Sequence, residues 1–198
     1  MKGKTHLIVG LAAGVTIALY REVESISLVI LGTSIGSLMP DIDHPKSKIN
    51  QKLLQHKNKS YKILFYTLVG IALLYIYSLN NNSLFLLGGT ITILIGVSKH
   101  RGFTHSLLGI FLFIKLGKDL TLEFGYKELY LGFYIGYLFH LIADFFTKGG
   151  IELLYPFSEN FSFPLPIKTG GTIENIVAFI LLIYSFYSIL KYFNFIIF

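Results

Sequence analysis

The chain has 198 residues, of which 53% are apolar and 14% are charged, whereas soluble domains carry about 25% charged residues. It has a formal net charge of +6 and no cysteine, so disulfide bonds and thiolate metal sites are excluded. Apolar runs recur along the whole chain, and no soluble half can be separated from them. The composition therefore predicts a single membrane-embedded domain, residues 1–198.

The positive charge fits either nucleic-acid binding or membrane orientation. Basic residues interleaved with apolar runs are typical of the positive-inside rule, so we favour membrane orientation and expect no nucleic-acid partner. Lys2 and Lys4 precede an apolar run, as in a secretory signal peptide. Because no small-residue cleavage site precedes Arg21 and another apolar run follows, we expect this segment to stay in the mature protein.

Seven apolar segments are expected to form helices, which predicts an all-α integral membrane bundle of about five to seven apolar helices. A helix needs about 20 residues to span a bilayer, and only segments 61–79 and 173–192 are comfortably long enough. The other segments are expected to be short or partly inserted. The seven segments are 7–20, 26–39, 61–79, 84–98, 106–116, 129–143 and 173–192.

If these segments cross the membrane alternately, the N-terminus and the linkers at 40–60, 99–105 and 144–172 share one face. Twelve of the 17 Lys and Arg residues lie on or beside that face. The positive-inside rule then makes it cytoplasmic. We expect a multi-pass protein of the inner, or plasma, membrane.

Gly-x-x-x-Gly spacing occurs in three of the apolar segments. This spacing places both glycines on one helix face, where two backbones can approach closely in lipid. We therefore expect the first, second and sixth segments to form the tight centre of the bundle. The pairs are Gly10 with Gly14, Gly32 with Gly36, and Gly132 with Gly136.

Polar residues stand at the ends of the first two apolar segments. His6 is either an interfacial histidine beside two lysines or a metal ligand. Pro40 should end the second helix, which would place Asp41, Asp43 and His44 at its mouth. These three residues fit a solvated turn as well as they fit a set of cation ligands.

Two further clusters follow. His100 and His105 lie in "HRGFTHS", and His140 and Asp144 lie at i and i+4 in "HLIAD". The second spacing puts both side chains on one helix face, as in helical metal motifs, although a capping or salt-bridged pair has the same spacing. An unpaired ionisable group in hydrocarbon would cost a few kcal/mol, so partners are expected.

The alternating topology puts all these ends on one membrane face, where they can converge into a single polar basin. Their number exceeds what one tetrahedral ion needs, so we expect a site for two or more divalent ions, zinc first and manganese or another divalent ion second. His56 lies in a lysine-rich linker and is expected at the surface. The candidate ligands are His6, Asp41, Asp43, His44, His100, His105, His140 and Asp144.

Such ions supply a hydroxide nucleophile near neutral pH and stabilise charge on a phosphoryl or carbonyl oxygen. The guanidinium of Arg101 suits a pair of phosphate oxygens, although a cytoplasmic anchor is an equal alternative. Glu174 is either a complement to the helix dipole or a further ligand or general base.

The segment 148–175 is Pro-rich and apolar without a helical period, which favours an interfacial lid. A serine hydrolase using Ser106 is disfavoured because no Gly-x-Ser-x-Gly elbow occurs.

Four stretches of the sequence resemble the YdjM family of LexA-regulated, membrane-bound, metal-dependent hydrolases. They are "PDIDHPKS" at 40–47, "HRGFTHSLL" at 100–108, "GYLFHLIADFFTKGGIELLYP" at 136–156 and the later "FPLPIKTGGTIEN". The family is distantly similar to the helical zinc-dependent phospholipase C and P1 nuclease group, which cleaves phosphodiesters. The resemblance implies that His6, Asp41, His44, His100, His105, His140 and Asp144 bind metal, with Asp43 and Glu174 as further candidates.

We therefore expect a membrane-bound, metal-dependent hydrolase that cleaves a phosphoester, most simply that of a lipid, at the cytoplasmic face. In this hypothesis Arg101, Asp43 and Glu174 take catalytic roles. The alternative is a membrane protein that binds or transports divalent metal without catalysis. Transporters keep their sites near the bilayer midplane on broken helices, whereas these residues lie at helix ends.

Overall fold

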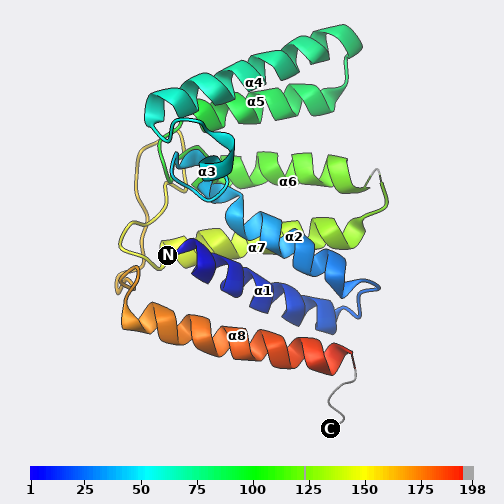
Figure 1. Cartoon of the computed structure of the whole chain (residues 1–198), viewed down its shortest axis with the longest axis vertical. Coiled ribbons are helices and arrows are strands. Elements are labelled where there is room, and N and C mark those ends of the chain that lie inside the picture. The colour runs from blue at the N-terminus through cyan, green and yellow to red at the C-terminus, as the bar shows by residue number, and fades with distance from the viewer. Residues whose placement is uncertain (123, 194–198) are drawn as a thin grey trace. The chain divides into compact units, whose positions relative to one another are not determined.

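A computed structural model describes residues 1–122 and 124–193, and the regular secondary structure of this part of the chain is helical apart from one isolated bridge between Thr147 and Ile167 (Figure 1). The predicted all-α fold is confirmed. The chain forms two compact units, each described by itself. The first comprises Met1–Met39, Phe124–Gly150 and Phe161–Phe198, and the second comprises Pro40–Glu123 and Ile151–Asn160. The single domain expected from composition stays a prediction.

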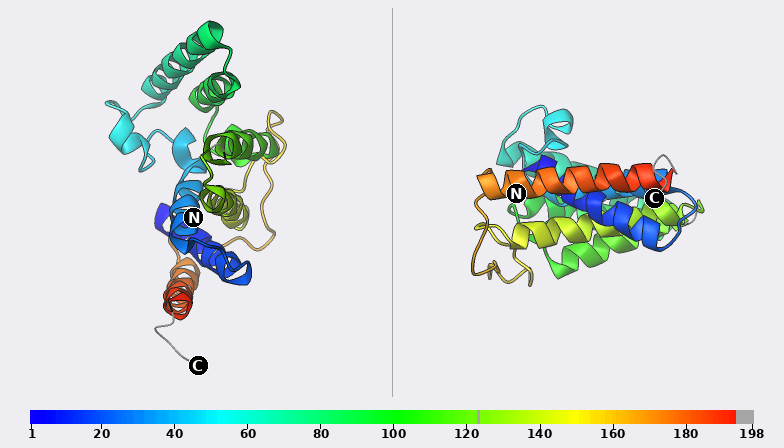
Figure 2. Two further views of the ribbon diagram at one scale, coloured as in Figure 1. Left: turned by 90° about the vertical axis from the view of Figure 1, so that its right-hand side faces the viewer. Right: turned by 90° about the horizontal axis from the view of Figure 1, so that it is seen from below.

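The first unit contains four long helices. They are α1 (Gly3–Tyr20), α2 (Ile26–Leu38), α7 (Lys127–Phe145) and α8 (Thr172–Tyr192). Helices α1, α2 and α7 all pack against one another, and α8 packs along α1 (Figure 2). The predicted packing of the first, second and sixth apolar segments against one another is therefore confirmed, and their place at the centre of the whole bundle stays a prediction.

Glycines make the contact between α2 and α7 possible. A Cβ atom on Gly32 would lie 2.2 Å from the carbonyl oxygen of Leu129, and one on Gly36 would lie 2.2 Å from that of Phe133. The α7 glycine Gly136 meets α2 in the same way, with 2.3 Å to the Thr33 carbonyl oxygen. Any side chain at these positions would push the two backbones apart, as is usual where small residues form a membrane helix interface.

The second unit contains the remaining helices. They are the 3-10 helix η1 (Pro40–Asp43), α3 (Asn50–Leu53), α4 (Lys59–Asn80), α5 (Ser83–Val97), the 3-10 helix η2 (Phe103–His105) and α6 (Leu107–Leu122). Helices α4 and α5 pack along each other (Figure 1). The chain turns between them at Asn81, which adopts the left-handed conformation with φ 54°. Asparagine tolerates this conformation better than most residues.

All seven predicted apolar helices are present, but the expected number of comfortable spans was too low. Four stretches are long and apolar enough to cross a membrane: Gly3–Tyr20, Ile26–Asp43, Lys59–Asn80 and Thr172–Tyr192. The first helix gains length because it begins at Gly3 rather than near Leu7. The second stretch gains length because η1 follows α2 almost directly.

The apolar surface lies where a lipid contact is expected. Large apolar side chains on α4 and α8 are exposed, among them Leu68 and Phe179, at 58% and 64%. Lipid would cover such faces in a bilayer, while polar side chains such as His6, Asp43 and His140 are buried. The loop after α7 has no regular helix before α8, and Phe157 and Leu165 are exposed on it. Its role as a lid stays a prediction.

The glycine contact between α2 and α7 gives the first test. Gly36→Ala would place a methyl group against the α7 backbone, so we expect the free energy of unfolding to fall by about 1–3 kcal/mol, as in other overpacked sites. The matched control is Gly88→Ala on α5, where the nearest atom to the new Cβ is 3.7 Å away on Leu73. Thermal unfolding in detergent compares the variants, and equal melting temperatures would contradict the close contact.

Candidate metal centre

The last two turns of α7 present an imidazole and a carboxylate on the glycine stripe of that helix. Gly132, Gly136, His140 and Asp144 follow one another at intervals of four residues and so share one helix face. His140 and Asp144 are 0% and 1% exposed. The contact that the glycines create with α2 therefore continues into a polar site at the end of α7.

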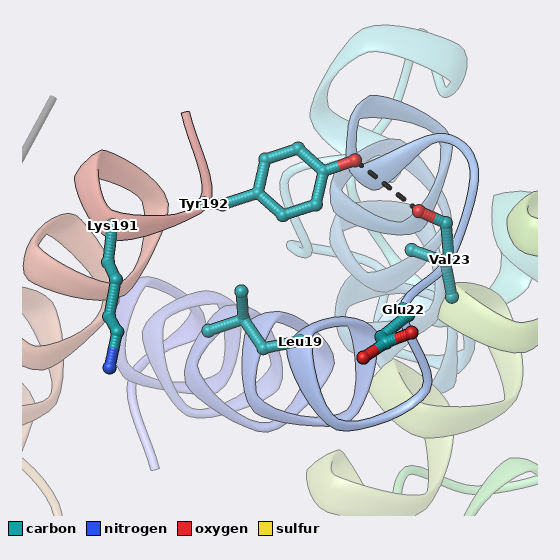
Figure 3. Close-up of a pocket in the computed structure, with 5 residues that line it drawn as sticks. All are labelled: Leu19, Glu22, Val23, Lys191 and Tyr192. Atoms are coloured by element: carbon teal, nitrogen blue, oxygen red, sulfur yellow. Dashed lines mark hydrogen bonds between the residues drawn. The ribbon is translucent and has the colours of Figure 1, made fainter. Parts of the chain in front are cut away.

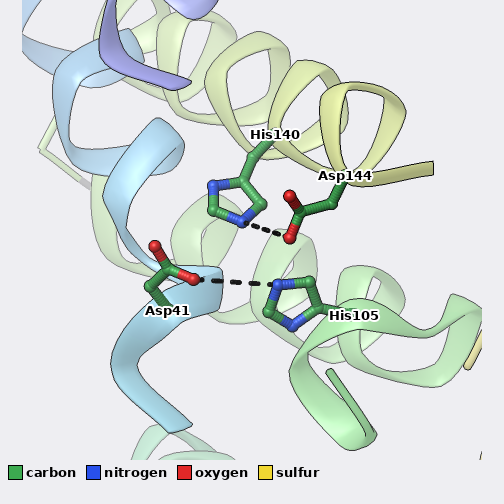
Figure 4. Close-up of side chains that lie close together, drawn as sticks. All are labelled: Asp41, His105, His140 and Asp144. Carbon is green, nitrogen blue, oxygen red and sulfur yellow. Dashed lines mark ion pairs between the residues drawn. The ribbon is translucent and has the colours of Figure 1, made fainter. Parts of the chain in front are cut away.

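The tautomer of His140 follows from its contact with α2. Its Nδ1 lies 2.7 Å from the carbonyl oxygen of Ser37, which can only accept, so Nδ1 carries the proton and donates. In a neutral imidazole the lone pair is then on Nε2. Nε2 faces Asp144, with 3.8 Å to its Oδ2 (Figure 4). An Nδ1–H group anchored on a backbone carbonyl oxygen, which leaves the lone pair of Nε2 available, is typical of metal-binding histidines.

His6 lies against this pair from α1. Its ring stacks on that of His140, with 3.7 Å between centroids and 14° between planes, and its Nε2 is 3.2 Å from Oδ1 of Asp144. The side chain is buried, yet neither ring nitrogen makes a hydrogen bond. The Met1 amino group also contacts Oδ1, at 2.6 Å. The first unit thus brings His6, His140 and Asp144 together, as the sequence predicts.

In the second unit, Asp43 organises the turn that follows α5. This fully buried carboxylate accepts hydrogen bonds from Nδ1 of His100 at 2.8 Å, from the backbone N–H of Arg101 at 2.9 Å and from Oγ1 of Thr104 at 2.8 Å. These donors hold Asp43 between η1 and η2. Its contacts are those of a residue that orients histidines, and its predicted catalytic role stays a prediction.

The same network sets the tautomer of His105. The only proton of the Thr104 hydroxyl is donated to Asp43, so Oγ1 of Thr104 accepts from Nδ1 of His105 at 3.0 Å. Nε2 of His105 then has the lone pair, and it faces Oδ1 of Asp41 at 3.9 Å (Figure 4). His105 is fully buried, and Asp41 is partly exposed.

The two pairs share one geometry. Separations of 3.8 Å in His140–Asp144 and 3.9 Å in His105–Asp41 are too long for a hydrogen bond. They lie below about 4.2 Å, which is twice a zinc–nitrogen or zinc–oxygen bond of about 2.1 Å. Each imidazole and carboxylate can therefore bind one ion between them. Each of the four side chains is a donor of the kind that could bind a metal ion.

His44 and His100 are arranged differently. Nδ1 of His44 accepts from the backbone N–H of Lys46 at 3.2 Å, which in the neutral ring leaves the proton on Nε2. Burial, followed by the nearby His100, lowers the pKa of His44 below its ordinary value. The two rings meet edge to face with 4.7 Å between centroids. Metal binding by His44 and His100 stays a prediction, as does convergence of all eight donors on one basin.

Arg101 has a left-handed backbone, with φ 66°. Its N–H donates to Asp43, and its carbonyl oxygen accepts from the N–H of Glu152 at 3.1 Å. Glu152 also forms an ion pair with Lys99. Hydrogen bonds thus hold both the N–H and the carbonyl group of Arg101. The left-handed conformation between them is unfavourable for any residue with a Cβ atom. Such local strain is often kept at functional sites.

Glu174 is buried in the first turn of α8 and joins two helix starts. Its Oε1 accepts from the backbone N–H of Lys2 at 2.8 Å and from Oγ1 of Thr5 at 2.6 Å, and its Oε2 accepts from the N–H of Gly170 at 2.7 Å. These contacts are those of an anchoring carboxylate. The predicted catalytic role of Glu174 stays a prediction.

Three residues that were not predicted from the sequence are buried among the predicted residues of the second unit: Thr104, Asn50 and Lys62. Thr104 sits inside "HRGFTHS", but a hydroxyl has no distinctive spacing. Lys62 gave the clearer signal, because a lysine near the start of a long apolar run needs a partner. His56 is exposed, as expected.

A cavity of about 480 Å³ lies at the other end of α1 from His6 (Figure 3). It is lined by Leu19, Glu22, Val23, Lys191 and Tyr192, and the Tyr192 hydroxyl donates to the Val23 carbonyl oxygen at 3.3 Å. Its lining offers one carboxylate and no imidazole, which is a poor donor set for a zinc-type ion. We therefore place no metal there.

Comparison with known proteins identifies the family. Residues 1–197 match the YdjM inner membrane protein family. The uncharacterized protein YvsG of Bacillus subtilis (strain 168) is 29% identical over 177 residues, which cover 89% of this chain and 87% of that protein. The inner membrane protein YdjM of Escherichia coli (strain K12) is 27% identical over 163 residues, 79% of this chain and 64% of that protein. No solved structure matches the chain.

The chain therefore belongs to the YdjM inner membrane protein family, as the sequence motifs predicted. It is an inner membrane protein with several candidate transmembrane helices, so the bilayer is its environment. This chain spans less than two thirds of the length of the Escherichia coli relative.

The backbone of Arg101 gives the second test. Arg101→Gly and Arg101→Ala both remove the side chain, but only glycine accepts a left-handed φ without strain. We expect the glycine variant to be more stable than the alanine variant by about 1 kcal/mol, the reverse of their usual order. Chemical denaturation in detergent measures the difference, and an alanine variant of equal or greater stability would contradict the strained conformation.

Proposed function

We propose that this member of the YdjM family is a membrane-bound, metal-dependent hydrolase in which the pair His140–Asp144 and the pair His105–Asp41 bind divalent metal ions. The observation that carries the proposal is the repeated pair geometry. In both pairs Nδ1 of the imidazole is hydrogen-bonded, and Nε2 faces a carboxylate oxygen at 3.8–3.9 Å. Such anchoring of a metal-binding histidine is usual in zinc sites.

The chemistry of the donors selects the class of metal. The chain has no cysteine, so nitrogen and oxygen atoms must supply every side-chain ligand. Imidazole with carboxylate suits zinc and also manganese, whereas magnesium and calcium prefer oxygen alone. Zinc is therefore our first choice, with manganese or another divalent ion as the second.

His6 is the residue that favours two or more ions. Its buried ring has no hydrogen bond, and it lies against Oδ1 of Asp144 while His140 lies against Oδ2 of the same carboxylate. A carboxylate that faces two imidazoles with its two oxygens suits a bridging position. We assign His6 to a second ion, and we keep His44 and His100 as further ligands in the proposal.

The proposed reaction is hydrolysis of a phosphoester, most simply that of a lipid in the same membrane. Zinc-type ions supply a hydroxide near neutral pH and offset charge on a phosphoryl oxygen. The guanidinium of Arg101 would hold the phosphate oxygens. Asp43 would act through the histidines that it orients. Glu174 would fix the ends of α1 and α8, with a general-base role as its alternative. We place the site at the cytoplasmic face on the distribution of Lys and Arg.

The second candidate is a protein that binds or transports divalent metal without catalysis. Its support is the same set of donors. Against it, His6 lies in the first turns of α1 and Asp144 lies in the last turn of α7, and the remaining pair lies on 3-10 turns. Transport sites usually lie near the middle of broken helices. Position therefore favours chemistry at the membrane surface.

Metal content gives the third test. The full chain in nanodiscs should bind at least one zinc or manganese ion per protein, measured by elemental analysis after dialysis against the metal. His140→Ala combined with Asp144→Ala should lose most of this metal, because it removes a complete pair. The control is His56→Ala, which changes an exposed histidine in the lysine-rich linker and should bind metal as the wild type does. A double variant with full metal content would exclude the site.

Activity is the fourth test and separates the two functions. Nanodiscs with phospholipid substrate are followed by phosphorus NMR, with a chelator as the reference. We expect metal-dependent release of a phosphorylated product and at least a 100-fold slower reaction in His105→Ala. A protein that binds metal but hydrolyses no phosphoester, and that carries metal across proteoliposomes, would support the second candidate instead.

A further inference from the structure

A buried lysine links the two turns of the second unit that carry its candidate ligands. We define the first donor turn as residues 40–44 and the second donor turn as residues 98–105. Lys62, in the first turn of α4, is 2% exposed. Its Nζ donates to the carbonyl oxygen of Asp43 at 2.9 Å and to that of Ser98 at 2.8 Å. One ammonium group therefore contacts the end of η1 and the start of the second donor turn.

Asn50 and Tyr66 continue this contact along the first donor turn. Nδ2 of Asn50 donates to the carbonyl oxygens of Ile42 at 2.7 Å and His44 at 2.8 Å. The hydroxyl of Tyr66 donates to Oδ1 of Asn50 and so fixes the orientation of the amide. Lys62 and Asn50 thus bind three consecutive carbonyl groups, those of residues 42, 43 and 44.

Burying the charged side chain of Lys62 costs free energy. A buried charge needs strong compensation, and an ionisable residue near the start of an apolar span is usually kept for function. An apolar side chain would fill the same space, but it would leave the carbonyls of Asp43 and Ser98 without this donor. Metal ligands must be held to within about 0.5 Å of their productive positions, which requires rigid support behind them.

We propose that Lys62, Asn50 and Tyr66 are positioning residues that set the separation of the two donor turns and thereby the metal affinity of Asp41 and His105. The inference rests on the proposed metal site for its consequence, whereas the link between the turns depends only on the hydrogen bonds above. Asp43 extends the link, because its carboxylate is hydrogen-bonded to the second donor turn while its carbonyl oxygen is bound by Lys62.

The experiment compares Lys62→Met with Lys59→Met in the full chain in nanodiscs. Both replace a lysine in the first turn of α4, but Lys59 is exposed. Zinc titration should show at least a 10-fold rise in the dissociation constant for Lys62→Met, as for other residues that support metal ligands. The dissociation constant of Lys59→Met for zinc should stay within about 2-fold of the wild-type value, because Lys59 supports no candidate ligand. The spectrum of bound cobalt should change only in Lys62→Met.

Hydrogen exchange without metal tests the link itself. In Lys62→Met, the amides of both donor turns should exchange at least 10-fold faster than in Lys59→Met, because both turns lose the same anchor. Tyr66→Phe, which keeps the ring, should weaken zinc binding about 3-fold, and it replaces Lys62→Met if that variant does not fold.

The outcomes separate the two proposals. A wild type that binds no metal overturns the proposed function, and hydrogen exchange then still decides whether Lys62 links the turns. A wild type that binds zinc, with Lys62→Met and Tyr66→Phe binding it equally well, overturns the positioning role alone. Unchanged exchange in both donor turns overturns the link.

Discussion

The backbone contact between α2 and α7 is the constraint on which the first unit depends. Gly36 and Gly136 let the two helices approach until a Cβ atom on either would overlap a backbone oxygen. One turn further along α7, the same approach brings the carbonyl oxygen of Ser37 to Nδ1 of His140. Packing of small residues therefore decides which nitrogen of His140 carries the proton, and so which nitrogen faces Asp144. In this unit the proposed chemistry depends on the helix interface, because the close contact of α2 with α7 orients His140. A larger residue in the glycine stripe would disturb both.

The second unit reaches the same arrangement by a different route. No helix face supplies the acceptor for Nδ1 of His105. Instead the Thr104 hydroxyl donates its hydrogen bond to Asp43, and the oxygen of Thr104 then accepts from Nδ1 of His105. Buried polar groups are costly when unpaired, and here each hydrogen bond fixes the direction of the next. Both local structures leave Nε2 facing a carboxylate oxygen at 3.8–3.9 Å, which is longer than a direct salt bridge would favour and fits the proposed ion between the two groups.

The sequence predicted the large features well because they follow from periodicity. Seven apolar segments became seven helices, and two of the Gly-x-x-x-Gly pairs marked α2 and α7, whose backbones meet at those glycines. Helix ends were less accurate, since α1 begins before its apolar run. The candidate ligands were identified by residue type and position at helix ends. Their supporting contacts were not, because Lys62 with Ser98 and Glu174 with Thr5 join residues far apart in the chain. No local pattern specifies such a pairing, and only the conspicuous lysine in an apolar run hinted at it.

The membrane explains why polar residues are distributed as they are. Lipid can cover the apolar faces of α4 and α8, but it cannot hydrate a carboxylate or an imidazole, so every such group must be satisfied within the protein. Asp43 and Lys62 meet this demand through main-chain and side-chain partners. His6 meets it only in part, since its buried ring makes no hydrogen bond and has one charged contact, at 3.2 Å to Oδ1 of Asp144. A family built only for anchoring in the bilayer would gain stability from an apolar residue at that position. The buried imidazole beside Asp144, which makes no hydrogen bond, is therefore the strongest physical argument for the proposed metal site.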